Sequence, residues 1–184
     1  MFQQCENSAM PSARETEFLE AAYRYVLTHG LADVSLRPLA AAIGSSTRVL
    51  LYLFGSKEGL VRALPARARA DELALLADIG TGSGVVARLC DWLSAHRPLL
   101  TLWLEAYARS LVKPDGPWAG FARATVEDWL EVLKAGQPEE VRETAAGLVS
   151  RTRELAVLRG ALLDLLATGD GERVTAALRA SLAP

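Results

Sequence analysis

The stretch that decides the fold is residues 35–60, which read SLRPLAAAIGSSTRVLLYLFGSKEGL. Two short segments with apolar residues at helical spacing, about 35–43 and 47–54, flank a turn that begins at Gly44. Gly55 closes the second segment, because glycine readily adopts the backbone conformation that ends a helix. Two short helices joined by a turn of about four residues are typical of a helix-turn-helix.

A longer helix precedes this pair. Ser12 followed by Glu15 forms a capping-box pattern, and apolar residues recur at helical spacing from there until Gly30. Residues 1–11 are polar and show no periodicity, so they are expected to form a flexible arm outside the fold.

Beyond the helix-turn-helix the helical segments lengthen. Ser56 can cap a fourth helix, which Pro65 is expected to interrupt or restart. Later helices are expected over residues 65–79, 85–95, 97–112, 117–135, 138–168 and 171–182. Runs of alternating β-branched and aromatic residues are missing, so the pattern gives no support for strands. The sequence predicts an all-α fold, with a three-helix helix-turn-helix domain at 12–64 and a larger helical bundle at 65–184.

Composition excludes several classes of protein. The chain of 184 residues is 51% hydrophobic, which argues against a disordered protein, and its net charge of −2 gives no general support for nucleic-acid binding. Its apolar stretches fall short of the ~20 residues that cross a bilayer, and no secretory leader opens the chain, so a cytoplasmic protein without a membrane partner is expected. Cys5 and Cys90 are too few for a disulfide framework, which favours a reducing compartment.

A local basic patch coincides with the helix-turn-helix, where four basic residues stand against one acidic residue. Recognition helices read base edges with their first turn. Arg48 can donate two hydrogen bonds to guanine, and the Thr47 hydroxyl can bond a base or a phosphate. Val49 or the Tyr52 ring can pack on a thymine methyl, and Lys57 opens the next helix, where a phosphate fits. The alternative is that these are ordinary solvated side chains of a helical hairpin.

Four segments in register resemble the N-terminal domain of the TetR family of bacterial repressors. They are FLEAA at 18–22, GLADVSLR at 30–37, LAAAIGSS at 39–46 and LLYLFGSKEGL at 50–60. The resemblance covers roughly residues 14–62. It implies an all-helical homodimeric regulator, whose N-terminal domains bind DNA and whose C-terminal domains form the dimer contact and a ligand pocket.

The resemblance also assigns DNA-contacting positions. Carried over by position, these are Ser35, Arg37, Thr47, Arg48, Val49, Tyr52 and Lys57. Leu51 stands where a tyrosine is usual in the family, and Leu53 where a phosphate-contacting histidine is common. More of the phosphate contact is therefore expected from Tyr52 and Lys57.

Catalytic chemistry has little support in the sequence. His29 and His96 are the two histidines, and neither belongs to a metal-binding pattern. The glycine-rich run at 80–84 has no preceding strand and no following lysine, so it is interpreted as a helix connector and not as a phosphate-binding loop. We therefore expect no enzyme activity, no metal and no cofactor.

Aromatic side chains concentrate in the C-terminal part and are candidates for a ligand pocket. The candidate residues are Trp92, His96, Leu99, Trp103, Tyr107, Trp118, Phe121 and Trp129. Several large rings with few charges favour a mostly apolar ligand. The alternative for each member is plain core, and a surface ion pair explains Glu105 and Arg109 nearly as well as a place in the pocket.

The last two helices carry an apolar stripe that fits a two-fold contact between protomers. The candidate dimer residues are Leu155, Leu158, Leu162, Leu166, Val174 and Leu178. The alternative is burial of the stripe inside one bundle.

The sequence thus favours a ligand-responsive, DNA-binding transcriptional regulator. We expect a homodimeric repressor that releases a palindromic operator on double-stranded DNA when it binds a small, mostly apolar effector. A helical module of the same ancestry that captures a small molecule or a protein without binding DNA is the first rival, and a helical-bundle enzyme is the second. Selection of bound sequences from random duplex DNA separates these hypotheses.

Overall fold

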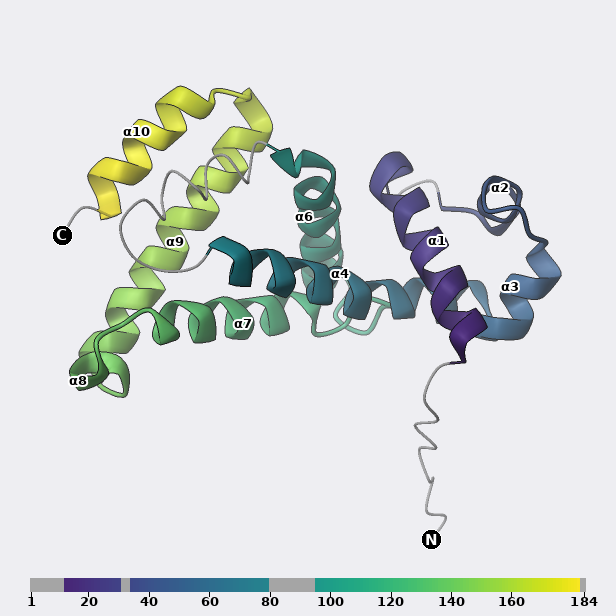
Figure 1. Ribbon diagram of the computed structural model, residues 1–184, viewed down its shortest axis with the longest axis horizontal. Coiled ribbons are helices and arrows are strands. Elements are labelled where there is room, and N and C mark those ends of the chain that lie inside the picture. The colour runs from purple at the N-terminus through teal and green to yellow at the C-terminus, as the bar shows by residue number, and fades with distance from the viewer. Residues whose placement is uncertain (1–11, 31–33, 80–94, 183–184) are drawn as a thin grey trace, which may run out of the picture. The chain divides into compact units, whose positions relative to one another are not determined.

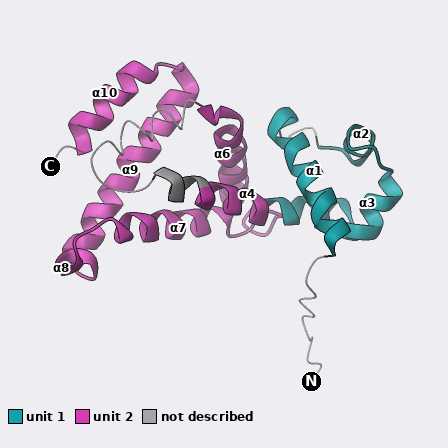
Figure 2. Ribbon diagram, viewed as in Figure 1, with its two compact units in different colours: residues 1–64 teal, residues 65–184 magenta. Residues whose placement is uncertain are grey.

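The computed structural model describes residues 12–30, 34–79 and 95–182, with the side chains of 75–79 left aside. Every regular element in those ranges is a helix, which confirms the all-α class predicted from the sequence. The chain divides into two compact units, residues 1–64 and 65–184 (Figure 2).

Unit 1 contains α1 (Ala13–His29), α2 (Leu36–Ala42), α3 (Thr47–Phe54) and the first turns of α4 (Lys57–Ile79), and its first three helices pack on one another (Figure 1). The Ser12 hydroxyl caps α1 by accepting a hydrogen bond from the Glu15 N–H at 3.1 Å. Val26, Leu39 and Leu50 are buried together with residues of α4, and they form the small core on which α3 is mounted.

The connection from α3 to α4 depends on glycine. Gly55 has a φ of 72°, in the left-handed region where a side chain is strained. A Cβ on Gly59 would lie 2.0 Å from the Phe54 carbonyl oxygen, so the first turn of α4 approaches the end of α3 more closely than any other residue allows. The Ser56 hydroxyl accepts a hydrogen bond from the Gly59 N–H at 2.9 Å, which confirms Ser56 as the predicted cap.

The prediction that Pro65 interrupts or restarts the fourth helix is wrong, because α4 runs from Lys57 to Ile79 with Pro65 inside it. Proline costs an interior hydrogen bond and a steric clash. Leu60, Leu64 and Ala68 nevertheless recur every four residues and are all buried, so one continuous apolar face extends on both sides of the proline. Burial of that face outweighs the local cost.

Unit 2 contains the rest of α4 together with α6 (Arg97–Val112), α7 (Phe121–Ala135), α8 (Glu139–Arg142), α9 (Ala145–Thr168) and α10 (Gly171–Leu182). The long helix α9 packs against α6, α7 and α10, as Figure 1 shows for α9 and α10. Leu102 and Ala106 of α6, Thr125 of α7, and Leu158 and Leu162 of α9 are all buried.

Two predicted helices have different bounds in unit 2, and a third lies outside the described residues. The helix expected over 138–168 is divided into α8 and α9, because the Thr144 hydroxyl accepts from the Gly147 N–H at 3.0 Å and caps a new helix. The helix expected over 117–135 begins only at Phe121, after Gly120 with a φ of 75°. The helix expected over 85–95 falls almost entirely outside the described ranges.

Candidate functional site

Helix α3 presents one anchored face and one exposed face. Leu50 is buried in unit 1, and the Ser46 hydroxyl caps the helix by accepting from the Val49 N–H at 3.3 Å. On the other side Arg48 is exposed and Tyr52 is 86% exposed, although tyrosine is a large and largely apolar side chain. An exposed aromatic ring beside an exposed arginine, on a helix held by its opposite face, is suited to contact a ligand outside the chain.

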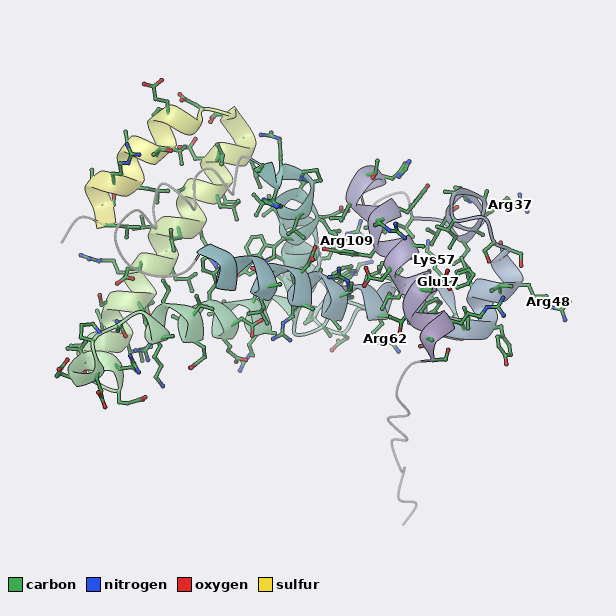
Figure 3. The ribbon with its side chains drawn as sticks, viewed as in Figure 1. Glu17, Arg37, Arg48, Lys57, Arg62 and Arg109 are labelled. Carbon is green, nitrogen blue, oxygen red and sulfur yellow. The ribbon has the colours of Figure 1, made fainter. Side chains whose placement is uncertain are left out.

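The other predicted DNA-contacting residues surround this face. Ser35, Arg37 and Lys57 are exposed, and Thr47 and Val49 are half-buried. Arg37 and Arg48 extend outward from their helices in Figure 3. Ser35 occupies the N-cap position of α2, where its hydroxyl makes no capping hydrogen bond within the described part of the chain.

An open hollow of about 190 Å³ connects α3 with the start of α1. Arg48, Val49 and Tyr52 line it from α3 together with Leu53, and Arg14 lines it from α1. Arg14 is not among the DNA-contacting residues predicted from the sequence. The sequence does place this basic residue in the first turn of the capped helix. In the structure its guanidinium stands 5.8 Å from the centroid of the Phe18 ring.

Unit 2 brings some of the predicted aromatic residues together in pairs. The Trp103 and Tyr107 rings of α6 have centroids 5.0 Å apart, and Trp118 and Phe121 meet edge to face at 5.5 Å. Both tryptophans and Phe121 are buried, as is Leu99 of α6. Tyr107 and Trp129 are half-buried, His96 is half-buried at the position before α6, and Trp92 lies outside the described residues.

The carboxyl group of Glu72 lies buried beside Trp129. Glu72 of α4 is 6% exposed, and its Oε1 accepts a hydrogen bond from Trp129 Nε1 at 2.6 Å. The pKa of Glu72 is raised from 4.5 to about 7, mainly because burial disfavours the charged carboxylate and also because the negative charge of Asp128 is near. The Trp129 hydrogen bond and the charges of Arg159 and Arg69 act in the opposite direction.

Two arginines of unit 2 are held in different ways. Arg69 donates from Nε and Nη2 to the two carboxylate oxygens of Asp128, at 2.9 and 2.8 Å. Arg159 stands 5.7 Å from the Trp103 ring centroid and 5.2 Å from that of Tyr107, and its Nη1 donates to the Tyr107 hydroxyl at 3.3 Å. Its Nε and Nη2 are buried and have no hydrogen-bond partner among the described residues.

Glu72 and Arg159 are not among the site residues predicted from the sequence. Glu72 continues the four-residue spacing of the buried residues Leu60, Leu64 and Ala68, so a carboxyl group at the next position of that face was a readable anomaly. Arg159 is one of two charged residues in an otherwise apolar segment, which carried the same kind of signal.

The predicted dimer residues are corrected by their burial. Five of the six, namely Leu155, Leu158, Leu162, Val174 and Leu178, are at most 8% exposed within the single chain. They form the contact between α9 and its neighbours inside unit 2, which was the alternative left open by the sequence. Leu166 alone keeps part of its side chain accessible.

Neither a metal site nor a membrane span emerges from the described residues. They contain no group of three or more His, Cys, Asp and Glu side chains that could hold a metal ion. No described helix is long and apolar enough to cross a membrane.

Comparison with known proteins agrees with this geometry. Residues 18–64 match the family model described as bacterial regulatory proteins, tetR family. The chain is 28% identical over 165 residues to the HTH-type transcriptional regulator BetI of Burkholderia thailandensis, covering 83% of this chain and 84% of that protein.

Solved structures share the fold. A TetR transcription regulator from Haloarcula marismortui has a TM-score of 0.71 at 21% identity, over 91% of this chain and 94% of that one. The multidrug binding protein EbrR, complexed with imidazole, has a TM-score of 0.58 at 23% identity, over 91% of this chain and 89% of that one.

A small helical unit that exposes Arg48 and Tyr52 on the second helix of a helix-turn-helix, joined to a larger helical unit, is the architecture typical of a helix-turn-helix transcriptional regulator. Residues 18–64 carry the N-terminal domain of the TetR family of bacterial regulatory proteins, and the whole chain is similar to transcriptional regulators of that family.

Proposed function

We propose that this regulator binds a near-palindromic operator as a homodimer and releases it when a small molecule binds unit 2. The observation that carries the DNA part is the exposed face of α3, with Arg48 and the 86% exposed Tyr52. Arg48, Thr47, Val49 and Tyr52 read base edges in the major groove.

Phosphate contacts are assigned to the residues around α3. Lys57 lies in the first turn of α4, where free backbone N–H groups favour an anion. Ser35 and Arg37 stand at the start of α2, and both are exposed. Arg14 lines the hollow beside Arg48 and is added to this set.

Dimerisation is assigned to the outward face of α9, one residue offset from its buried face. The exposed residues there recur every three or four positions, the spacing with which helices pack on one another. They are Val149, Arg153, Ala156, Gly160, Leu163 and Ala167. A Cβ added to Gly160 would meet nothing within 4 Å, so a second helix has room to approach closely there. A second copy of the same face, related by a two-fold axis, suits this surface.

The effector is assigned to the interior of unit 2 around Trp103 and Tyr107. Buried aromatic rings beside a few polar groups are the usual composition of a small-molecule site. The similarity to a multidrug binding protein supports small-molecule binding at the level of the fold. Binding lowers operator affinity only if the effector prefers a conformation that does not fit DNA.

Selection of bound sequences from random duplex DNA tests the DNA part. We expect a near-palindrome whose half-sites are spaced by about one helical turn, roughly 34–36 Å, or a multiple of it. Arg48→Ala should cost about 1–3 kcal/mol and relax preference at one base position in each half-site. Lys57→Ala should weaken all sequences alike and reduce the salt dependence.

Two results would contradict this assignment. No enrichment over scrambled duplexes would favour the rival function, a ligand-binding module without DNA binding. An identical, sequence-independent loss in the Arg48 and Lys57 variants would overturn the division into base and phosphate contacts.

A further inference from the structure

Arg159 carries two hydrogen-bond donor atoms that no described residue uses. Its Nε and Nη2 are buried and unpartnered among the described residues, while Nη1 donates to the Tyr107 hydroxyl. The rings of Trp103 and Tyr107 lie within 6 Å of the same guanidinium. Nη1 is thus held by the Tyr107 hydroxyl, and the edge formed by Nε and Nη2 offers two buried donors.

The two unused atoms form one edge of the guanidinium, and their N–H bonds run side by side. Arg69 of the same unit uses this very edge, because its Nε and Nη2 each donate to one carboxylate oxygen of Asp128. The fork matches the two oxygens of a carboxylate in spacing and plane. The chain therefore contains its own example of what such an edge binds.

Other buried polar atoms in the neighbourhood also lack partners. Oε2 of Glu72 and Nε1 of Trp103 are both buried and unpartnered within the described ranges. Glu72 is close enough to Arg159 for the arginine charge to lower its pKa, yet no hydrogen bond joins the two side chains in this structure. Buried donors and acceptors are normally paired, and a group of unpaired ones contributed by α4, α6 and α9 marks a site for a polar ligand group.

We propose that the effector of unit 2 is a monocarboxylate with an apolar or aromatic body, and that its carboxylate accepts hydrogen bonds from Nε and Nη2 of Arg159. The body of the ligand packs among the apolar side chains that bury this edge, Trp103 among them. This inference rests on the proposed function and deepens it. It keeps the sequence-based expectation of a small, mostly apolar effector and adds one carboxylate to it.

A single carboxylate fits better than a larger anion. Arg69, the second arginine that acts on the same region, is already engaged with Asp128. Glu72 and Asp128 are both acidic, so a group with two negative charges would meet repulsion that one carboxylate largely avoids.

Calorimetric titration of the full-length chain tests the proposal with matched pairs of probes. The probes are benzoate, 4-phenylbutyrate and octanoate, each beside its neutral amide, so that only the carboxylate differs within a pair. We expect at least one carboxylate to bind at least tenfold more tightly than its amide and to raise the melting temperature. Arg159→Gln should remove at least nine-tenths of that affinity. Arg109→Gln, which changes an exposed arginine of α6, should leave it unchanged.

Loss of folding cannot imitate the expected result. The comparison of carboxylate with amide needs no variant, and Arg159→Lys keeps the positive charge while it removes the two-donor edge. Equal affinity within every pair, or full binding by the folded Arg159→Gln chain, would overturn the proposal.

Operator binding is measured separately, by fluorescence anisotropy without any probe. A chain that binds DNA but prefers no carboxylate refutes the ligand class alone. A chain that binds a carboxylate through Arg159 but selects no DNA sequence refutes the proposed regulatory function and leaves the site intact.

Discussion

Replacing Glu72 with glutamine should stabilise the protein at pH 8 and have little effect at pH 4.5. Glutamine keeps an Oε1 that can accept the hydrogen bond from Trp129 Nε1, and it cannot ionise. The carboxyl of Glu72 is 6% exposed, and its pKa is raised from 4.5 to about 7 in the folded chain. The substitution therefore removes the cost of a buried carboxylate while it preserves the contact.

The sign and size of the effect follow from proton linkage. The unfolded chain releases this proton near its ordinary pKa of 4.5, whereas the folded chain holds it up to about pH 7. Between those values the unfolded state binds fewer protons, so the free energy of unfolding decreases as pH rises and levels off above 7. The difference between the two pKa values lowers the free energy of unfolding above pH 7 by about 3 kcal/mol, since each pKa unit corresponds to about 1.4 kcal/mol.

Urea unfolding followed by tryptophan fluorescence measures this difference, at one fixed chain concentration because dimerisation adds to apparent stability. Glu127→Gln is the control, since it removes an exposed negative charge from α7. A Glu72→Gln gain at pH 8 no larger than the gain at pH 4.5 would refute the reasoning, and so would an equal pH dependence in the control.

The remaining predictions concern one turn and one surface. Gly59→Ala places a Cβ 2.0 Å from the Phe54 carbonyl oxygen and should cost about 1–3 kcal/mol in urea unfolding, whereas unchanged stability would mean that the turn shifts freely. Leu163→Glu puts a charge on the outward face of α9 and should dissociate the dimer in sedimentation, with operator affinity falling in parallel. Leu111→Glu, at an exposed position of α6, is the control and should leave the dimer intact. If the Leu163→Glu chain remains dimeric, the interface does not lie on the outward face of α9.

Unit 1 was predictable because its determinants are local in the sequence. A cap at Ser12, a cap at Ser56 and glycines at 30, 44 and 55 each act within one turn of a helix, and all of them appear in the structure where the sequence places them. A cap or a left-handed glycine has the same effect whatever lies further along the chain. The helix bounds in unit 1 therefore agree with the expected ones to within about two residues.

The errors lie where packing between distant segments decides the structure. Pro65 ends helices in isolation, but burial of Leu64 and Ala68 on either side keeps α4 continuous. The apolar stripe on α9 is buried inside unit 2, since an apolar pattern does not say whether the same chain or a second copy covers it. The outward face of α9 consists mostly of small residues, so its apolar pattern is weaker than that of the buried leucines one residue away.

The polar centre of unit 2 consists of Glu72, Trp129, Arg159 and Tyr107. It could not be predicted as a site from the sequence, because these residues are far apart in the chain. Glu72 and Trp129 are separated by 57 residues and meet only when α4 and α7 pack. Arg159 reaches Tyr107 across 52 residues. Each was visible alone as a charge in an apolar pattern, and only the fold shows that the charges share one neighbourhood.

If the proposed effector binds beside Arg159 and Glu72, helix α4 is the element expected to couple its binding to the operator. It carries Lys57 at its first turn and Glu72 four turns later, and no break separates them. A carboxylate bound to Arg159 adds a negative charge near Glu72, which favours the protonated form of that side chain and changes what α4 must bury. The effector then binds more tightly to the conformation in which α4 buries the neutral carboxyl of Glu72 than to the other conformation. The difference between these two binding free energies is what can weaken operator binding. Reciprocity requires the operator to weaken effector binding by the same factor, so a chain whose two ligands bind independently would exclude α4 as the coupling element.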